Sequence, residues 1–85
     1  MKSDYYVYAI YSIKNNTIYV GLSVSPEKRL QGHNYGMTKS TKPHRPWSMF
    51  YKEKIGDRIN ARKREKYLKS GTGKEFLKSL LRKPL

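Results

Sequence analysis

The chain contains no cysteine, few acidic residues and no long apolar run. The absence of cysteine excludes disulfides, thiolate zinc sites and a cysteine nucleophile. Without an apolar stretch of about 18 residues, the sequence offers no candidate transmembrane helix. Its first residues, MKSDYYVYAIYSI, are too rich in tyrosine for a secretory signal. We therefore expect a cytoplasmic protein with no membrane partner.

Positive charge is what the sequence has in excess. Its 85 residues include 19 Lys and Arg but only 6 Asp and Glu, so the formal net charge is +13. Such self-repulsion destabilises a compact chain unless a polyanion neutralises it, and nucleic acid is the leading candidate because each phosphate contact releases counterions. An anionic membrane surface is the alternative partner. Basic helices that bind membranes usually carry aromatic residues themselves, whereas the aromatic residues of this chain lie mostly in strand-like segments or loops. Charge alone therefore predicts that the protein binds a polyanion, but it does not predict any catalytic activity.

The residue pattern predicts one small α+β domain over residues 1–85, with a three-stranded antiparallel sheet flanked by helices in the order ββαβαα. Aromatic and β-branched residues predict strands at Tyr5–Ile13 and Thr17–Leu22. The intervening Lys14–Asn16 fits a tight hairpin, because asparagine tolerates a positive φ. These two strands are expected to pair directly.

The middle of the chain is predicted to hold a short helix, a loop and a third strand. Ser25–Glu27 predicts a helix start, with serine as the N-cap and proline in the first turn, and the helix should end near Gly36. Residues 36–46 form a polar, basic loop in this prediction. Trp47–Tyr51 then has the composition of a strand.

Two helices are predicted at the C-terminal end. Asp57 can cap a helix over about Arg58–Ser70, which Gly71 would close in the left-handed conformation. Thr72–Glu75 matches a capping box for a last helix. The apolar stripe of that helix predicts core packing and consists of Phe76, Leu77, Leu80 and Leu81.

One carboxylate, Glu65, stands within the cation-rich stretch ARKREKYLK of residues 61–69. Ala61, Glu65 and Leu68 fall at positions i, i+4 and i+7, so the carboxylate shares a helix face with apolar residues. A solvated i,i+4 ion pair of Glu65 with Lys69 is the alternative and would contribute about 0.2–0.5 kcal/mol. The spacing alone leaves both interpretations open.

Other candidate site residues lie on the first two strands and the short helix. The hairpin can make Tyr8 and Tyr19 neighbours, and Gly21 on the same face permits close approach of a backbone or a ligand. Arg29 and His33 are four residues apart and project from the same side of a helix. Each also has a plainer role, since strand tyrosines pack, arginines contact phosphate and a lone histidine is usually structural.

In chain order, these residues form a specific set. Tyr6-Val7-Tyr8, ten further residues and Tyr19-Val20-Gly21 are followed by Arg29, His33 and Arg64-Glu65. This set resembles the GIY-YIG nuclease superfamily, in which paired strand motifs precede an arginine–histidine helix motif and an acidic helix motif. The resemblance covers nearly the whole chain, and the predicted ββαβαα order agrees with the family's fold.

Two further segments, RPW at 45–47 and LKSGTGKEFL at 68–77, resemble the short stand-alone bacterial members. Tyr6 replaces the glycine of the first motif, and Val20 replaces the isoleucine of the second. No counterpart is found for the asparagine that some members carry after the glutamate. These departures concern substrate placement and leave the central residues intact.

The resemblance implies a metal-dependent endonuclease that hydrolyses phosphodiester bonds in DNA with low sequence specificity, in DNA repair or mobile elements. Flaps, nicks and branched DNA are the candidate substrates, and RNA is the alternative to DNA. A divalent ion, Mg²⁺ or Mn²⁺, is the only cofactor implied. The implied catalytic residues are Tyr8, Tyr19, Arg29, His33 and Glu65, and the implied nucleic-acid contacts are Lys39, Lys42 and Arg45.

Each implied role has a chemical reason. Glu65 would be the metal ligand, because one carboxylate can anchor Mg²⁺ that also binds water and phosphate. Arg29 would stabilise charge on the phosphate oxygens. Tyr8 would be the general base, its phenolate favoured by a cationic site, with Tyr19 and His33 positioning water or assisting proton transfer. The basic loop would hold the nucleic-acid backbone without reading sequence.

Two alternatives from other classes stay open. One is a non-catalytic DNA- or RNA-binding module that uses the fold for its positive surface. The other is an accessory subunit of a larger repair complex. A pure binding module has no need of the acid at Glu65, which favours the enzyme.

Overall fold

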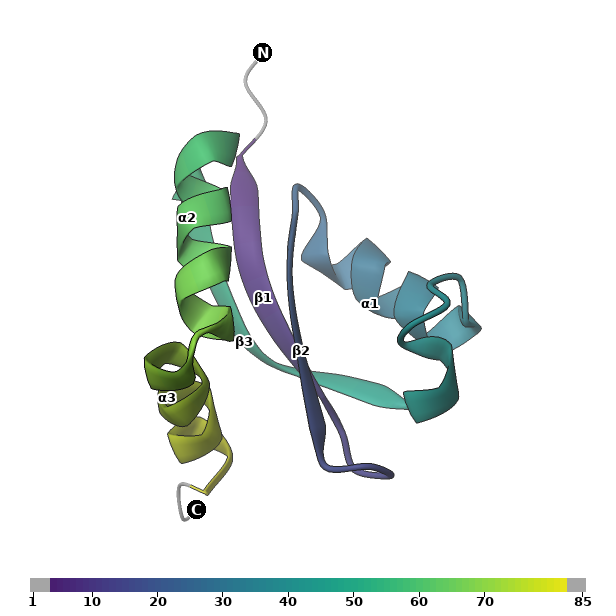
Figure 1. Cartoon of the computed structure of the whole chain (residues 1–85). Helices are drawn as coiled ribbons and strands as arrows, with labels where there is room; N and C mark the ends of the chain where they lie inside the picture. The colour runs from purple at the N-terminus through teal and green to yellow at the C-terminus, as the bar shows by residue number, and fades with distance from the viewer. Residues whose placement is uncertain (1–3, 83–85) are drawn as a thin grey trace.

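The chain folds into a three-stranded antiparallel sheet with helices on both faces (Figure 1). This computed structural model describes residues 4–82, so the ends of the predicted 1–85 domain lie outside the described residues. The predicted α+β class and the ββαβαα order are confirmed. The elements are β1 (Tyr5–Ser12), β2 (Thr17–Ser23), α1 (Pro26–Tyr35), the short 3₁₀ helix η1 (Lys42–His44), β3 (Trp47–Gly56), α2 (Arg58–Lys69) and α3 (Gly71–Arg82).

The central strand of the sheet is β1, and the strand order is β2-β1-β3. The predicted hairpin joins β1 to β2, and Asn16 takes a left-handed φ of 52° there, as expected for asparagine. The register places Tyr8 opposite Gly21 and Ile10 opposite Tyr19. Because paired residues share a face, these four residues lie on the same side of the sheet.

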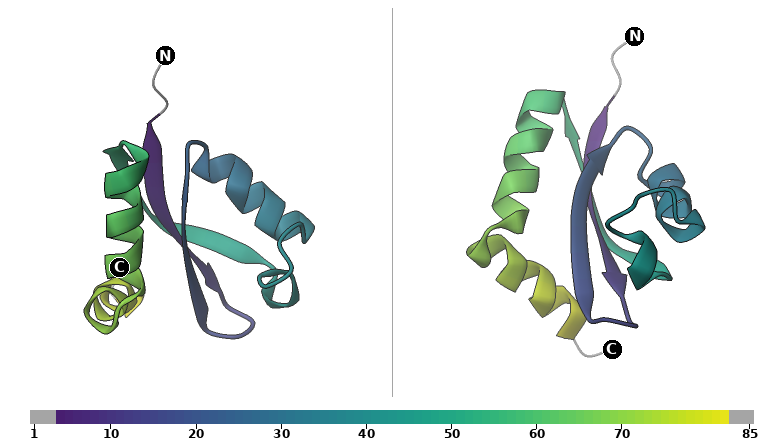
Figure 2. Two further views of the ribbon diagram at one scale, coloured as in Figure 1. Left: turned by 45° about the horizontal axis from the view of Figure 1, so that its top comes forward. Right: turned by 45° about the vertical axis from the view of Figure 1, so that its right-hand side comes forward.

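Alternate residues of β1 supply two separate cores. Figure 2 shows α2 and α3 on one side of the sheet and α1 on the other. Val7 and Ala9 are fully buried against α2 and α3, through side chains that include Leu68 and Leu77. Tyr8 and Ile10 face the other way and pack with Trp47, Leu30, Met49 and Tyr19 under α1. Because β1 is buried on both faces, aromatic and apolar residues occupy nearly all of its positions, and this composition predicted the strand. Among the helices of residues 4–82, none has the length and apolarity needed to cross a bilayer.

The third strand is longer than predicted, because β3 continues past Tyr51 to Gly56. Its second half carries charged residues, which are not typical of strands, and the predicted strand ended before them. Cross-element ion pairs accommodate those charges: Lys52 contacts Glu27 of α1 at 2.5 Å, and Glu53 accepts from Arg64 of α2 at 2.9 Å. The prediction missed these partners because both lie far away in the sequence.

The junction between α2 and α3 also differs from the prediction. Asp57 caps α2 as expected and accepts from the Asn60 N–H at 2.9 Å. However, Ser70 rather than Gly71 ends α2, in extended rather than left-handed backbone, and Gly71 already begins α3. The predicted capping box at Thr72–Glu75 is therefore wrong, and the Ser70 hydroxyl accepts from the Gly73 N–H at 3.3 Å. This turn brings the two helices into close contact.

The apolar stripe of α3 packs less completely than predicted. Leu77 is fully buried and Leu80 is partly buried in the α2–α3 core. Phe76 and Leu81 remain 40% and 37% exposed. A sheet of three strands offers too little surface for a third helix to bury its whole apolar face.

Gly73→Ala is expected to destabilise the protein by about 1–3 kcal/mol, the range for forcing extra atoms into a packed site. A Cβ at Gly73 would overlap the Tyr67 carbonyl oxygen and lie 2.5 Å from the Leu68 Cα. Neither backbone atom can yield without moving α2. Urea unfolding followed by circular dichroism measures the change in free energy.

Gly71→Ala is the matched control, because a Cβ there meets no atom within 4 Å. We expect this variant to be neutral or more stable than the wild type by up to about 1 kcal/mol. Equal stability of the Gly71 and Gly73 variants would contradict the close α2–α3 contact.

Candidate active site

The candidate site begins at Tyr8, whose side chain is 1% exposed on the α1 side of the sheet. Its ring lies across β2 at Gly21, where a Cβ would come within 2.6 Å of the phenol oxygen. Only glycine leaves room for the ring at this position. The close approach expected at Gly21 is thus made by the Tyr8 side chain, rather than by a backbone or a ligand.

His33 of α1 lies directly over the two tyrosines. It is fully buried, and its Nε2 is 3.0 Å from the Tyr8 hydroxyl oxygen. The Tyr19 ring centre is 4.9 Å from the His33 ring centre and 6.5 Å from the Tyr8 ring centre. The expected proximity of Tyr8 and Tyr19 is therefore confirmed, and three of the predicted site residues form one cluster.

Burial controls the protonation of this cluster. It raises the pKa of Tyr8 above its ordinary value, an effect that the hydrogen bonding and charge of Arg29 only partly oppose. Burial likewise lowers the pKa of His33, and the Arg29 charge adds to that shift. The expectation that the cationic surroundings would favour a Tyr8 phenolate is therefore wrong. Desolvation dominates, and the resting site holds a neutral phenol beside a neutral imidazole.

Glu65 belongs to α2, which packs on the face of the sheet opposite to α1. It lies on the buried side of α2 with Ala61 and Leu68, as the helical spacing predicted, and is 6% exposed. Arg62 and Lys69 each contact one of its carboxylate oxygens at 3.1 Å. Both interpretations of Glu65 thus hold in part, because this carboxylate is inward-facing and also paired with Lys69.

The charge of Glu65 is the smallest of the causes that raise the pKa of Tyr8, after burial and the charge of Tyr19. The two helices that carry Glu65 and His33 pack on opposite faces of the sheet.

Arg29 stands at the exposed rim of this site. It is an exposed residue of α1, and no carboxylate among residues 4–82 lies within ion-pair distance of it. Its charge nevertheless influences the pKa of both Tyr8 and His33. Its guanidinium is therefore placed to meet an anion that approaches the tyrosine–histidine cluster.

The predicted nucleic-acid loop lies beside α1. Lys39 and Lys42 are exposed, and Arg45 is partly buried, with its Nε donating to the Lys42 carbonyl at 2.9 Å. Within the described part of the chain, none of the three forms an ion pair with a carboxylate. Their charges are available to an external anion.

Two polar residues with internal hydrogen bonds were not predicted from the sequence: Asn34, which is partly buried, and Thr41, which is buried. Asn34 accepts from the Trp47 N–H at 2.6 Å and donates to the Trp47 carbonyl at 3.1 Å, which joins α1 to β3. Thr41 is 1% exposed, and its hydroxyl oxygen is 2.8 Å from the His33 Nδ1. Asn34 could have been suspected from its place next to His33. Nothing in the sequence distinguishes Thr41 from the other polar residues of its loop.

The residues fit a divalent ion held by few protein ligands. Within residues 4–82, no group of three or more histidine, aspartate or glutamate side chains could hold a metal. Glu65 supplies one carboxylate, which suits Mg²⁺ because this ion keeps several waters and binds substrate phosphate. Its partners Arg62 and Lys69 have side chains that are 56% and 52% exposed, so each can rotate into solvent and free a carboxylate oxygen.

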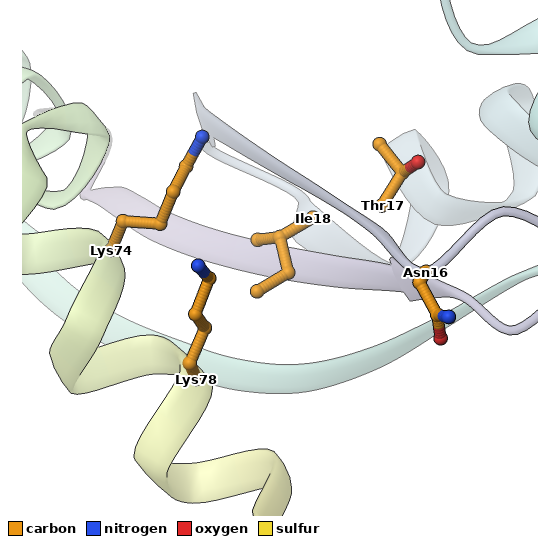
Figure 3. Close-up of a pocket in the computed structure, with 5 residues that line it drawn as sticks. All are labelled: Asn16, Thr17, Ile18, Lys74 and Lys78. Atoms are coloured by element: carbon orange, nitrogen blue, oxygen red, sulfur yellow. The ribbon is translucent and has the colours of Figure 1, made fainter.

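A separate pocket lies on the α3 side of the sheet, away from Tyr8. It is lined by Asn16, Thr17, Ile18, Lys74 and Lys78. Figure 3 shows both lysines extending from α3 toward Ile18 of β2. Ile18 packs with the α2–α3 core, whereas the neighbouring Tyr19 packs with the α1 core, so the sheet separates this pocket from the candidate site.

Comparison with known proteins identifies the class. The family model described as the GIY-YIG catalytic domain matches residues 4–78. A UPF0213 protein of Staphylococcus haemolyticus is 34% identical over 79 residues, which cover 92% of this chain and 95% of that protein. A UPF0213 protein of Syntrophus aciditrophicus is 36% identical over 84 residues, covering 96% and 95%. No solved structure matches the chain significantly.

These matches define the class of catalytic domains found in nucleases, a family whose members act on nucleic acid. The chain belongs to the GIY-YIG family, and the resemblance found in its motifs is confirmed. The UPF0213 relatives align over nearly their whole length, so they share the small size of this chain.

The buried histidine predicts a specific pH dependence of stability. Because the pKa of His33 is lowered by burial, the folded protein binds the imidazole proton less readily than the unfolded chain, whose histidine has a pKa of about 6.5. Acid therefore favours unfolding, and the free energy of unfolding should fall as the pH drops from about 7 to about 5. Urea unfolding at a series of pH values measures this slope.

His33→Gln removes the ionisable ring and should flatten the slope, although the variant will be less stable at neutral pH. The control is His44→Gln, because His44 is the second histidine of the chain and lies partly exposed in η1. It should retain the wild-type slope. If His33→Gln keeps the full slope, another group causes it.

Proposed function

We propose that this protein is a metal-dependent endonuclease that hydrolyses phosphodiester bonds in DNA with low sequence specificity. The observation that carries the proposal is the buried contact of 3.0 Å between the Tyr8 hydroxyl oxygen and the His33 Nε2, and the protein also buries the carboxylate of Glu65 on the inner face of α2. Membership of a nuclease family supports this interpretation. Flaps, nicks and branched DNA remain the candidate substrates.

Tyr8 is proposed as the general base, with His33 as its proton acceptor. Because burial raises the pKa of Tyr8, a phenolate is scarce in the resting enzyme and must be formed during the reaction. The neutral His33 imidazole lies within hydrogen-bond distance and can take the phenol proton at Nε2. The phenolate then accepts a proton from the attacking water. Tyr19, whose ring packs on His33, would position that water.

Arg29 is proposed to stabilise the charge that develops on the non-bridging phosphate oxygens. A guanidinium suits this role because its planar set of N–H donors matches two phosphate oxygens. Its exposed position at the rim lets a polymer reach it, and its influence on the pKa of Tyr8 and of His33 indicates that it lies near the reacting groups.

Glu65 is proposed to hold Mg²⁺ or Mn²⁺. When bound, the ion would supply positive charge to the phosphate and the leaving oxygen. Arg62 and Lys69 keep the carboxylate paired in the absence of an ion, and this reduces the cost of burying it. The nucleic-acid backbone would follow the basic loop, where Lys39, Lys42 and Arg45 supply phosphate contacts.

A non-catalytic nucleic-acid-binding module is the second candidate, and one observation favours it. Arg62 and Lys69 contact both carboxylate oxygens of Glu65, so this residue can be explained as a structural charge without any metal. The +13 charge would then serve binding alone. The tyrosine–histidine cluster has no role in this alternative beyond packing.

Glu65→Gln separates the two candidates. In the enzyme, the variant should lose cleavage at every Mg²⁺ or Mn²⁺ concentration, because the amide keeps the shape of the side chain but not its charge. DNA affinity should stay equal or increase, since one negative charge near the phosphates is gone. Cleavage is measured on plasmid, single-stranded, flap and four-way DNA, and affinity is measured without metal.

The control is Glu75→Gln, which removes an exposed acid of α3 that pairs with Lys78 at 3.6 Å. This variant should cleave like the wild type. Urea unfolding should place Glu65→Gln within about 1 kcal/mol of the wild type. Wild-type cleavage by Glu65→Gln would exclude the assigned mechanism. No cleavage by the wild type, on any of these substrates with either ion, would exclude the endonuclease.

Arg29→Ala should lower kcat by about 100-fold or more and leave DNA affinity nearly unchanged. One cation among 19 matters little for binding a polyanion, whereas a transition-state contact has no substitute. Lys28→Ala is the matched control, because Lys28 is the adjacent exposed cation of α1. A parallel loss of cleavage and affinity in Arg29→Ala would identify Arg29 as a phosphate anchor only.

A further inference from the structure

Thr41 is a buried hydroxyl in a loop that otherwise faces solvent. It lies between the exposed lysines at 39 and 42, yet its own side chain is 1% exposed. The hydroxyl oxygen is 2.8 Å from the His33 Nδ1 and 3.3 Å from the Thr38 carbonyl oxygen. These two neighbours restrict the direction in which the single hydroxyl proton of Thr41 can point.

The contact with Thr38 favours one direction for each hydrogen bond. The Thr38 carbonyl can only accept, so the Thr41 hydroxyl donates its proton there. Toward His33 the same oxygen can then only accept, and the Nδ1 must carry the imidazole proton. In a neutral ring the Nε2 is therefore free to accept from the Tyr8 hydroxyl at 3.0 Å.

We propose that Thr41 is a positioning residue that holds His33 in the Nδ1–H tautomer, so that the Nε2 can take the Tyr8 proton during cleavage. This inference rests on the proposed endonuclease function. In the step, the Tyr8 O–H bond breaks and an N–H bond forms at Nε2. The phenolate electron pair takes a proton from the attacking water, whose oxygen bonds to phosphorus as the bond to the leaving sugar oxygen breaks, and the leaving oxygen takes a proton from solvent. The imidazolium still donates from Nδ1 to Thr41.

The backbone around Thr41 is held in place, so the hydroxyl is a fixed acceptor. The Thr41 carbonyl accepts from the Trp47 indole N–H at 2.9 Å, and its N–H donates to the Thr38 carbonyl at 3.1 Å. The Trp47 backbone is in turn hydrogen-bonded to the side chain of Asn34 in α1, the helix that carries His33. Burial, which lowers the pKa of His33, also favours the neutral ring on which the tautomer argument depends.

The tautomer can be measured directly by NMR on protein containing isotope-labelled histidine, since protonated and bare ring nitrogens have distinct chemical shifts. For the wild type above pH 7, we expect the His33 Nδ1 to be protonated and the Nε2 to be bare. Thr41→Val keeps the shape of the side chain but offers no acceptor to Nδ1. This variant should shift the population toward the Nε2–H tautomer, and Thr41→Ser should restore the wild-type spectrum.

Cleavage kinetics provide the second measurement. Thr41→Val should lower kcat by about 10- to 100-fold, the range found when the partner that orients a functional histidine is removed. KM should stay unchanged, and Thr41→Ser should recover most of kcat. The control is Thr17→Val, which also deletes a threonine hydroxyl that donates to a backbone carbonyl, that of Asn15 at 3.1 Å, but in β2 away from His33.

Two results would overturn the inference: a wild-type spectrum with the proton on Nε2, or a Thr41→Val variant with unchanged tautomer and kcat. If urea titration shows that Thr41→Val does not fold, the test rests on the His33 tautomer in the wild-type spectrum and on the tautomer and kcat of Thr41→Ser. Absence of cleavage by the wild type, with the Nδ1–H tautomer present and dependent on Thr41, would count against the endonuclease proposal alone and support the positioning of His33.

Discussion

The burial of a neutral histidine is the constraint on which the α1 side of the molecule depends. His33 can lie at 0% exposure only because each ring nitrogen has a polar partner, Tyr8 on one side and Thr41 on the other. These contacts tie together the central strand, the first helix and the basic loop. The same contacts bring a phenol and an imidazole within reach of proton transfer, so stability and the proposed chemistry share one set of bonds.

A second constraint acts at the edge of the sheet. The proposed site takes residues from both faces of the sheet: Tyr8 lies under α1, and Glu65 lies on the buried side of α2. The missing side chain at Gly21 of β2 lets the Tyr8 ring extend to that edge. A larger residue there would force the Tyr8 ring aside. The glycine therefore serves the arrangement of the site rather than the conformation of the strand.

Much of the fold could be predicted because its signals are local. Aromatic and β-branched runs gave the strands of the hairpin, Asn16 adopted the expected positive φ, and Asp57 caps α2. The errors occurred where distant partners override local preference. The charges of β3 are paired with residues of α1 and α2, and the turn at Ser70 is determined by how closely α3 packs on α2.

The residue pattern was enough to single out residues that could carry the chemistry: the helical spacing put Glu65 on a buried face, and the strand motifs put Tyr8 beside Tyr19. Their protonation and their partners depend on the tertiary structure. The excess of positive charge suggested a phenolate at Tyr8, but burial raises its pKa, because desolvation depends on all the atoms packed around the hydroxyl. Thr41 was likewise identified as the partner of His33 only from the structure, because a contact between a loop and a helix produces no periodic pattern in the sequence.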